Sequence, residues 1–588
     1  MVTAVELLLA SLPLLVAGVL LVGFLWPATR AMPLAWITAV LVGYLAWGMP
    51  PDWIAAASIG GAITAITILW IVFGALFLLY VLQEAGAFDR INRGFAAVSD
   101  DRRVQIVLLA FFLSTFIEGA AGFGTPAAVV APLLLALGFP ALAAVVVAII
   151  GHVIAVTYGA VGTPIIIGIR NPLEVFESTI TAGGFTVPEF ADQVAAWAAT
   201  YHALVGFVMP FVAVAMAVYF FGGDDERSLE PAFEVAPLCL FAGVSFVVPY
   251  WVSAWFLTAE FPALIGAMVG GGLTVAALRA GYFLPDSHWE FPPRDEWPDH
   301  WIGSIEPGST DVSADGGRTA DMSLLRAWVP YVLLVVLLVV TRAVDPISAA
   351  IGDEELAVRI ADVSALGVEI GDVTLGIVLA WGNILGTGID NSIAWMSVPG
   401  FWLVVSALAA IPLFRMSGQE VRTAFGDTVR KLASPLIALV FVIAMVQVML
   451  QSGNPPGTDL DGMIVVLARA TADALGPAYP FVAALIGALG AAMAGSNTVS
   501  NITFSGFQFE AAGEVGVPRQ LVVGAQAVGG AIGNLVAIHN LVAALATVGL
   551  VGMEGRVMRL NFVVLLYYSI GVGVLAMLFS YVLFPGLF

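Results

Sequence analysis

Long apolar runs alternate with shorter polar connections along most of the 588-residue chain. Several of these runs reach the roughly 20 residues that a helix needs to cross the hydrocarbon core of a membrane. The clearest are Val5–Trp26, Ala62–Leu82, Val194–Phe221, Val235–Leu257, Trp328–Val340 with its flanks, and Leu560–Phe584. The pattern predicts an all-α polytopic membrane protein with about 12–14 transmembrane segments.

Two hydrophilic stretches interrupt this pattern. Gly281–Asp321 combines many acidic residues with Pro, Gly and Ser, and Asp345–Asp372 is also acidic. The composition of the first stretch supports no apolar core, which favours an extramembrane loop. The chain is therefore expected to divide into an N-terminal transmembrane half (1–280), an acidic loop (281–325) and a C-terminal transmembrane half (326–588).

The most informative polar residues lie inside an apolar region, at Gly495–Asn501, with the sequence Gly-Ser-Asn-Thr-Val-Ser-Asn. Polar groups at membrane depth are tolerated only where they are buried in protein or line a watery cavity. Burying five polar side chains without partners is costly. The break therefore predicts the tip of a re-entrant helical hairpin near residues 490–516, whose backbone amides suit a small anion.

The first half of the chain repeats this arrangement weakly. Glu118–Pro126 also follows an apolar run, and Gly495 lies 376 positions after Gly119, which predicts a first hairpin near residues 118–139. A second break follows each hairpin, at Tyr158–Pro164 and at Ala537–Asn540. Paired breaks at matching places predict two inverted repeats, each with a re-entrant hairpin and a discontinuous transmembrane helix.

The charge of the chain is unusual for a membrane protein. The formal net charge is −21, and Lys431 is the one lysine among 21 basic residues. An acidic, lysine-poor exterior favours adaptation to high salt, as in a halophilic prokaryote, although acidic loops alone also explain it. The single cysteine, Cys239, excludes an intrachain disulfide, and nothing in the sequence indicates nucleic-acid binding or a metal site.

At its motifs the chain resembles the L-lactate and glycolate permease family. The resemblance rests on both hairpin motifs, Tyr158–Pro164, Phe507–Gln508, Gln526, Ile538–Ala544, Thr547–Leu550 and Glu554–Arg556. It covers nearly the whole chain apart from the acidic loops. It implies a lactate permease, a multi-pass transporter of the cell membrane that takes up L-lactate, glycolate or a close 2-hydroxy monocarboxylate by symport with a cation, usually the proton.

Binding a monocarboxylate requires compensation of one negative charge and a hydrogen-bond partner for one hydroxyl. The motif-bearing segments contain no arginine, so compensation falls to hairpin-tip amides, half-helix N-termini and polar side chains. The predicted substrate-binding residues are Gly122, Gly124, Thr125, Ser496, Asn497, Thr498, Ser500, Asn501, His539 and Asn540. For the glycines, tight helix packing is an equally good explanation.

Glu118 is the predicted proton-coupling residue, because it is an acid at the entrance of the first hairpin. An ionisable group inside a membrane segment indicates a functional site, and burial favours its neutral form. Capping of the following half-helix is the alternative. His539 is the second coupling candidate. Secondary candidates for the site are His152, Tyr158, Thr163, Gln508 and Gln526.

Two other readings stay open at this point. A symporter of the same architecture coupled to Na⁺ would use hairpin carbonyls and hydroxyl or amide oxygens as ligands. A passive anion channel is a different class, which the paired breaks disfavour. A membrane enzyme is not expected, because no nucleophile, base and orienting residue occur at suitable spacing. We expect no cofactor beyond the coupling ion, and the sequence leaves a homo-oligomer open.

Overall fold

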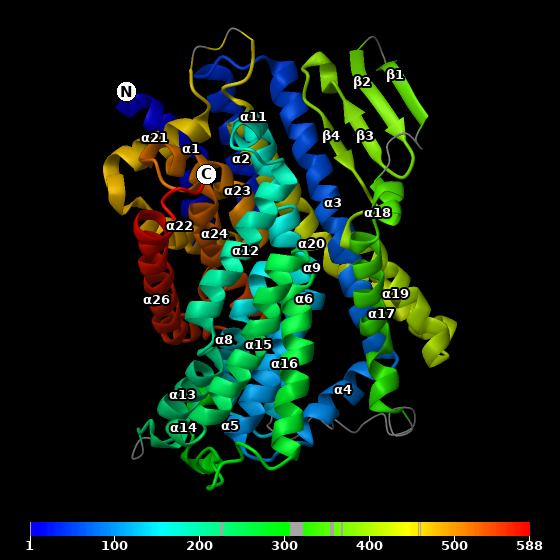
Figure 1. Ribbon diagram of the computed structural model, residues 1–588, viewed down its shortest axis with the longest axis vertical. Coiled ribbons are helices and arrows are strands. Elements are labelled where there is room, and N and C mark those ends of the chain that lie inside the picture. Colours follow the sequence, from blue (N-terminus) through cyan, green and yellow to red (C-terminus); the bar gives the residue numbers. More distant parts are fainter. Residues whose placement is uncertain are drawn as a thin grey trace.

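The computed structural model describes residues 2–223, 227–305, 322–352, 358–365, 368–456, 458 and 460–588. Most of these residues are helical (Figure 1). Within this part of the chain, 11 helices are long and apolar enough to cross a membrane, or up to 13 if each of two bent pairs counts as one span. The predicted helical, multi-span membrane fold is confirmed.

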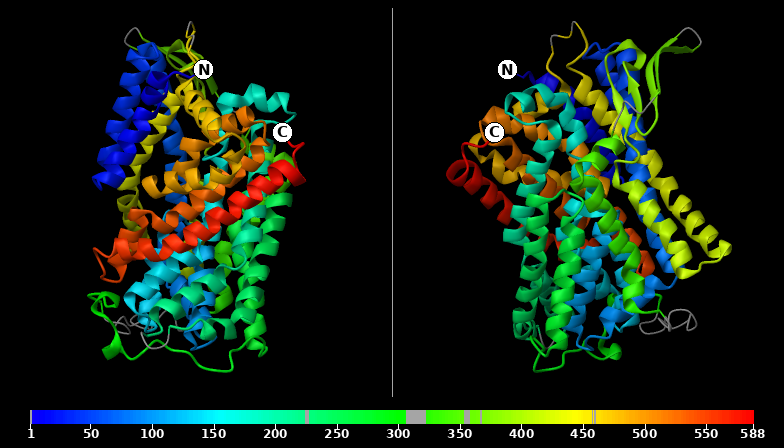
Figure 2. Two further views of the ribbon diagram at one scale, coloured as in Figure 1. Left: turned by 90° about the vertical axis from the view of Figure 1, so that its left-hand side faces the viewer. Right: turned by 45° about the vertical axis from the view of Figure 1, so that its right-hand side comes forward.

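The N-terminal helices form one group with two helices from the later half of the chain. They are α1 (Ala4–Gly18), α2 (Ala28–Leu45), α3 (Pro51–Glu84), α19 (Pro399–Phe414) and α20 (Gly418–Gln451). The long helices α3 and α20 pack along each other, and α19 and α2 flank them (Figure 2). A Cβ added at Gly61 would lie 2.6 Å from the Cα of Ala444, so this helix crossing requires glycine.

The segments predicted as the first hairpin and the first broken helix each consist of several helical pieces. The hairpin consists of α5 (Arg102–Gln105), a π-helical stretch (Ile106–Leu113), α6 (Ser114–Ala120) and α7 (Thr125–Ala136). The broken helix consists of α8 (Ala141–Gly151), a 3₁₀ helix (Val153–Tyr158) and α9 (Gly159–Ile166). Inside α9, Ala160, Val161 and Gly162 have left-handed backbone angles, with φ of 43°, 54° and 79°. The break is therefore a sharp interruption of the helix.

The second half of the chain has the same order of elements. Its hairpin consists of α22 (Tyr479–Ala494) and α23 (Asn497–Val515). Its broken helix consists of α24 (Arg519–Gly533), a 3₁₀ turn (Asn534–Val536) and α25 (Ile538–Thr547), with a bend of 43° at the break. That the two sets of elements are related by an inverted repeat remains a prediction.

The remaining helices surround these elements. They are α4 (Ala87–Ala96), α10 (Arg170–Leu173), α11 (Glu177–Ala182), α12 (Val187–Gly206), α13 (Met209–Phe221), α14 (Glu230–Glu234), α15 (Ala236–Phe256), α16 (Pro262–Arg279), α17 (Leu324–Ala343), α18 (Asp345–Gly352), α21 (Met463–Leu475) and α26 (Glu554–Leu578). Helix α26, red in Figure 2, runs obliquely across α22 and α24. The hairpins and broken helices therefore lie inside the helical body.

The second part of the Asp345–Asp372 stretch and the residues that follow it form a small sheet, which the all-α prediction missed. Its four antiparallel strands lie in the order β1 (Val358–Ala365), β2 (Val368–Leu375), β3 (Leu379–Gly382) and β4 (Asn391–Ile393). Apolar and polar residues alternate along β1 and β2, which is a strand pattern. The sheet lies above α18 and beside the N-terminal part of α3, at the end of the molecule that carries the N-terminus (Figure 1). Nδ2 of Asn391 fixes it to α3 by donating to the carbonyl of Gly60 at 2.9 Å.

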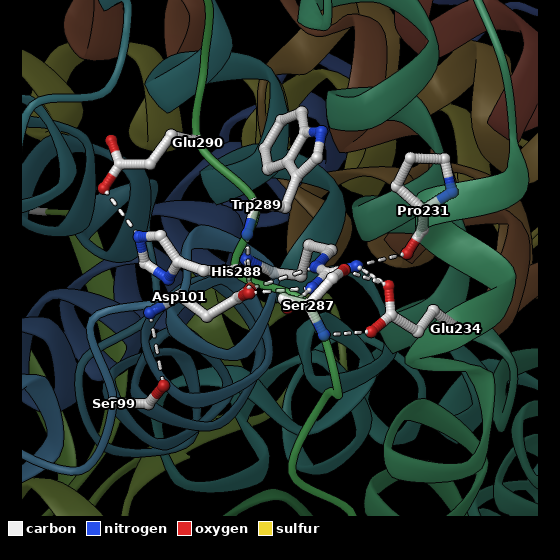
Figure 3. A network of polar contacts seen from close by, with 9 residues as sticks. Ser99, Asp101, Pro231, Glu234, Ser287, His288, Trp289 and Glu290 are labelled. Carbon is white, nitrogen blue, oxygen red and sulfur yellow. Dashed lines mark hydrogen bonds and ion pairs between the residues drawn. The ribbon is translucent and has the colours of Figure 1, made fainter.

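At the end of the molecule away from the sheet, where α5 and α14 lie (Figure 1), a buried arginine ties the acidic segment to these helices. Figure 3 shows its partners Asp101, Glu234 and Ser287. The guanidinium of Arg103 forms ion pairs of 2.8 Å with both Asp101 and Glu234 and donates to the carbonyl of Ser287 at 2.6 Å. The amide of Trp289 donates to Asp101 at 3.0 Å. Partial burial opposes the ionisation of Glu234, but hydrogen bonds from Ser287 and Arg103 outweigh it and lower the pKa of Glu234 to about 2.

Aromatic residues hold the same segment against the helices. Phe291 packs edge-on against Phe139, just after the first hairpin, with ring centroids 5.0 Å apart. Further along, the amide of Ser304 donates to the carbonyl of Gly549 at 3.0 Å. Residues 286–305 therefore pack on both halves of the chain, which their composition did not reveal. Residues 306–321 of the predicted loop lie outside the described residues.

Candidate functional site

Both hairpin tips and both helix breaks meet around one small cavity of about 20 Å³. Its lining residues are Glu118, Gly122, Phe123, Gly124, His152, Val156, Gly159, Ala160, Pro164, Gly495, Ser496, Asn497, Thr498, Asn534 and Asn540. A volume of this size holds about one water molecule. Residues separated by more than 400 positions therefore form a single polar centre inside the helical body.

The first hairpin tip offers mainly backbone to this cavity. Gly122, Phe123 and Gly124 have left-handed φ angles of 62°, 52° and 73°. Glycine adopts this conformation without strain, whereas Phe123 does so at a cost of about 1–2 kcal/mol. A Cβ added at Gly124 would lie 2.8 Å from Oδ1 of Asn540 on the second broken helix. The tip therefore makes a close approach that a side chain would prevent.

The second hairpin tip offers polar groups instead. Gly495, with φ of 70°, ends α22, and Ser496 caps α23 by accepting from the amide of Val499 at 3.4 Å. The first amides of a helix have no partner within the helix. The N–H groups of Asn497 and Thr498 at the start of α23 are therefore suited to a negatively charged group.

Asn497 is the side chain with the clearest unmet bonding capacity in the cavity. Its Nδ2 donates to the carbonyl of Val156, across the site, at 3.4 Å. Its Oδ1 is buried without a hydrogen-bond partner. Leaving a buried acceptor unpaired costs about 1–3 kcal/mol. A ligand that brings a donor to this oxygen would remove that cost.

Glu118 is the acidic residue of the cavity. It is only 4% exposed and makes no hydrogen bond or ion pair with any described residue. Its carboxyl lies directly against Gly159, where an added Cβ would overlap it. His152 also lines the cavity, with Nδ1 2.7 Å from the carbonyl of Ala148. The lining contains no arginine or lysine.

The structure brings about half of the predicted site residues to the cavity. Those that line it are Glu118, Gly122, Gly124, His152, Ser496, Asn497, Thr498 and Asn540. Those outside the lining are Thr125, Tyr158, Thr163, Ser500, Asn501, Gln508, Gln526 and His539. His539 packs on the second tip, with Nδ1 3.1 Å from a Cβ built at Gly495, but its side chain is exposed.

Several of the outer residues form a hydrogen-bonded network that supports the second hairpin. Nε2 of Gln526 donates to the hydroxyl of Ser500 at 3.1 Å, and Nε2 of Gln508 donates to Oε1 of Gln526 at 3.0 Å. The Tyr479 hydroxyl donates to Oε1 of Gln508 at 2.7 Å. Asn501 donates to the carbonyl of Pro164 at 3.0 Å and so joins this hairpin to the first break.

One buried histidine was not foreseen from the sequence. Nε2 of His202 lies 2.7 Å from the Thr157 hydroxyl and Nδ1 lies 2.5 Å from the Tyr568 hydroxyl. This chain of polar groups joins the first broken helix to α12 and α26. The available signal was a histidine in the middle of an apolar run. Asn534, which does line the cavity, gave the same kind of signal.

A much larger cavity, of about 850 Å³, lies next to the small one. Pro164 lines the small cavity, and Ile165 lines the large one. The large cavity extends between α10, α12, α17 and the sheet. Its charged lining residues are Arg170, Glu174, Asp192, Glu260, Arg342, Asp372 and Asp390. Arg342 pairs with Glu260 at 2.8 Å. The sheet therefore borders a large polar cavity, here called the vestibule, whose lining includes the residue next to Pro164.

Comparisons with known proteins cover nearly the whole chain. A sequence model of the family described as L-lactate permease matches residues 6–583. The chain is 27% identical to a putative L-lactate permease of Haemophilus influenzae, over 95% of this chain and 96% of the relative. It is 28% identical to the L-lactate permease of Bacillus subtilis, over 89% and 86% of the two chains. It is 26% identical to the glycolate permease GlcA of Escherichia coli, over 93% and 90%.

Among solved structures, the chain is similar to MtrF of Neisseria gonorrhoeae, which belongs to a class of antimetabolite efflux pumps. The identity is 12%, the TM-score is 0.39, and the match covers 87% of this chain and 81% of that one. The likeness is too distant for a comparison of individual residues.

Proposed function

The chain belongs to the L-lactate permease family, and we propose that it imports L-lactate, glycolate or a close 2-hydroxy monocarboxylate together with a proton. The names of its relatives in Haemophilus influenzae and Bacillus subtilis and of the Escherichia coli glycolate permease support the substrate class. The lining of the small cavity supports the proton as the coupling ion.

The observation that carries the proposal is a buried acid in a cavity that has no cationic lining residue. A carboxylate substrate in this cavity would lie close to Glu118, and two like charges in a poorly solvated site cannot both stay ionised. A proton on Glu118 removes the repulsion and turns the carboxyl into a hydrogen-bond donor. Substrate and proton would then enter the site together, which is the requirement for symport.

The second hairpin supplies the recognition groups. The amides of Asn497 and Thr498 would receive the substrate carboxylate at the positive end of α23. The 2-hydroxyl of the substrate would donate to Oδ1 of Asn497, which is buried without a partner and must turn away from Gly530 of α24 to meet the ligand. Under this assignment a hydroxy acid should bind better than an acid without the hydroxyl, because the unpaired acceptor penalises the latter.

The size of the cavity indicates that the site must open. About 20 Å³ accommodates a single water molecule and not a lactate ion, whereas the adjacent vestibule measures about 850 Å³. Binding therefore requires the hairpin tips and breaks to separate. A site that must widen to bind its substrate favours a transporter over a passive anion channel, which needs a continuous open pathway.

A Na⁺-coupled symporter is the second candidate. The oxygen-rich surroundings favour it: Oδ1 of Asn497 is without a partner, and the carbonyls of Val156 and Pro164 lie nearby as acceptors of asparagine amides. Oxygen ligands of this type bind hard cations. Glu118 would then contribute a charge rather than a proton.

Uptake of radiolabelled L-lactate into proteoliposomes distinguishes these candidates. With an inwardly directed proton gradient and no Na⁺, the proposal predicts accumulation above equilibrium, and a Na⁺ gradient alone should give none. If lactate accumulated only under the Na⁺ gradient, the coupling ion would be Na⁺ and not the proton. Fast equilibration without accumulation under either gradient would indicate a channel.

A further inference from the structure

A third cavity lies away from the substrate site, between α4, the first hairpin, α16 and α17. It measures about 240 Å³, and Phe112, Phe116, Gly271, Gly272 and Trp328 contribute to its mainly apolar lining. Arg279, at the C-terminal end of α16, is its one charged lining residue. We propose that this groove binds an acyl chain of an anionic membrane lipid, with the lipid headgroup at Arg279.

The groove opens between two helices that are expected to cross the membrane, so it faces lipid. Both α16 and α17 are long and apolar enough to cross a membrane. Gly272 is exposed, and a Cβ added there would meet no atom within 4 Å. An apolar opening between membrane helices lies against hydrocarbon rather than water, so a lipid chain is the occupant with matching chemistry.

The charge at the groove selects the headgroup. Arg279 is exposed and forms no ion pair with any described residue. Helix α4 and the C-terminal end of α16, which contribute to the groove, lie at the end of the molecule that also carries α5 (Figure 1). Arg90 and Arg93 belong to α4, and Arg102 belongs to α5. By the positive-inside rule this end faces the cytoplasm, whose leaflet is rich in anionic lipids. Arginine pairs well with a phosphate group.

The back wall of the groove belongs to the first hairpin. Phe112 and Phe116 lie on the arm that leads to the cavity, and Phe116 is two residues before Glu118. The Phe116 ring packs against Trp328 and Tyr331 of α17, with centroids 4.7 and 4.6 Å apart. A lipid chain in the groove would therefore contact the element that must move when the substrate site opens.

Native mass spectrometry of the full-length protein in detergent tests the lipid site directly. The probes are phosphatidylglycerol, which is anionic, and phosphatidylcholine with the same acyl chains. The wild type should bind one phosphatidylglycerol at least about tenfold more tightly than one phosphatidylcholine. Equal affinity for the two lipids, or no bound lipid, would overturn the proposal.

Two variants with matched controls assign that lipid to the groove. Gly272→Leu should fill the opening and weaken phosphatidylglycerol binding about tenfold, whereas Gly426→Leu, at a glycine of α20 with equally open surroundings, should not. Arg279→Gln should abolish the preference for the anionic lipid, whereas Arg422→Gln, on α20, should keep it. Met268→Trp provides a second filling variant from the same lining if Gly272→Leu fails to fold. Wild-type lipid binding in a folded filling variant would contradict the assignment.

Discussion

The two hairpin tips border the same cavity but contribute different chemistry to it. The first tip presents glycine backbone at Gly122 and Gly124 and one carboxyl, that of Glu118. The second presents the helix N-terminus and the polar side chains of Ser496, Asn497 and Thr498. Under the proposed function the two hairpins would divide the work, with the first holding the proton and the second holding the substrate.

The two helix breaks also differ, because the first has the more strained backbone. The first contains two non-glycine residues with left-handed backbone, Ala160 and Val161, each at a cost of about 1–2 kcal/mol. The second is a bend of 43° at Ala537, whose backbone is extended. The strained break lies beside Glu118, so the first repeat is the more constrained of the two and the second is the better supplied with donors.

Removal of the Asn497 side-chain amide should have the largest effect on the affinity for lactate. Asn497→Ala deletes the acceptor assigned to the 2-hydroxyl and the link to Val156, and should weaken lactate binding about 10–100-fold. Isothermal titration calorimetry on purified protein measures this change.

Asn561→Ala is the matched control for that variant. Asn561 is also buried, donates to one carbonyl, that of Leu535, and has an unpartnered Oδ1, but it does not line the cavity. Its substitution should leave lactate affinity within about twofold of the wild type. If Asn497→Ala and Asn561→Ala had equal affinities, the second hairpin would not be the binding hairpin.

A side chain at the first tip should have the next largest effect. Gly124→Ala places a Cβ against Oδ1 of Asn540 and should reduce lactate uptake about tenfold, because Asn540 must move out of the cavity lining. Gly516→Ala is the control, since Gly516 has nearly the same φ, 75° against 73°, with no atom within 4 Å. Similar uptake by the two variants would show that backbone strain, and not the close approach, determines the effect.

The network behind the second hairpin should matter for stability more than for binding. Gln508→Leu leaves the Tyr479 hydroxyl and Oε1 of Gln526 without their partner, which should lower the unfolding free energy by about 1–3 kcal/mol. The midpoint of thermal unfolding should fall, while the KM for lactate stays within about twofold. A large rise in KM with unchanged thermal stability would place Gln508 in the binding site.

The sequence predicted the helical membrane fold and the places where helices are interrupted, because both depend on local pattern. Breaks such as Gly495–Asn501 stand out against apolar surroundings wherever they occur. The sequence alone did not distinguish Ser496 and Asn497, which line the cavity, from Ser500 and Asn501, which do not. That separation depends on which face of α23 meets the first broken helix, and so on packing between residues hundreds of positions apart.

Two other features escaped the sequence analysis for related reasons. The alternation in Val358–Ala365 is a strand pattern, but we expected residues 326–588 to form a helical transmembrane half. The buried ion pairs of Arg103 join Asp101, on the same turn, to Glu234, which lies in another hydrophilic connection. Such pairing across the chain leaves no trace in composition.

The central claim is that Glu118 carries the coupled proton while the second hairpin binds the substrate. Glu118→Gln imitates the permanently protonated carboxyl, and it is compared with wild type and with Glu174→Gln, which alters a vestibule acid outside the small cavity. In proteoliposomes, Glu118→Gln should exchange internal for external lactate, because the loaded protein can still reorient. It should not accumulate lactate under a proton gradient, because the proton cannot be released. Accumulation by Glu118→Gln equal to that of the wild type and of Glu174→Gln would contradict the account and make His539 the next residue to test.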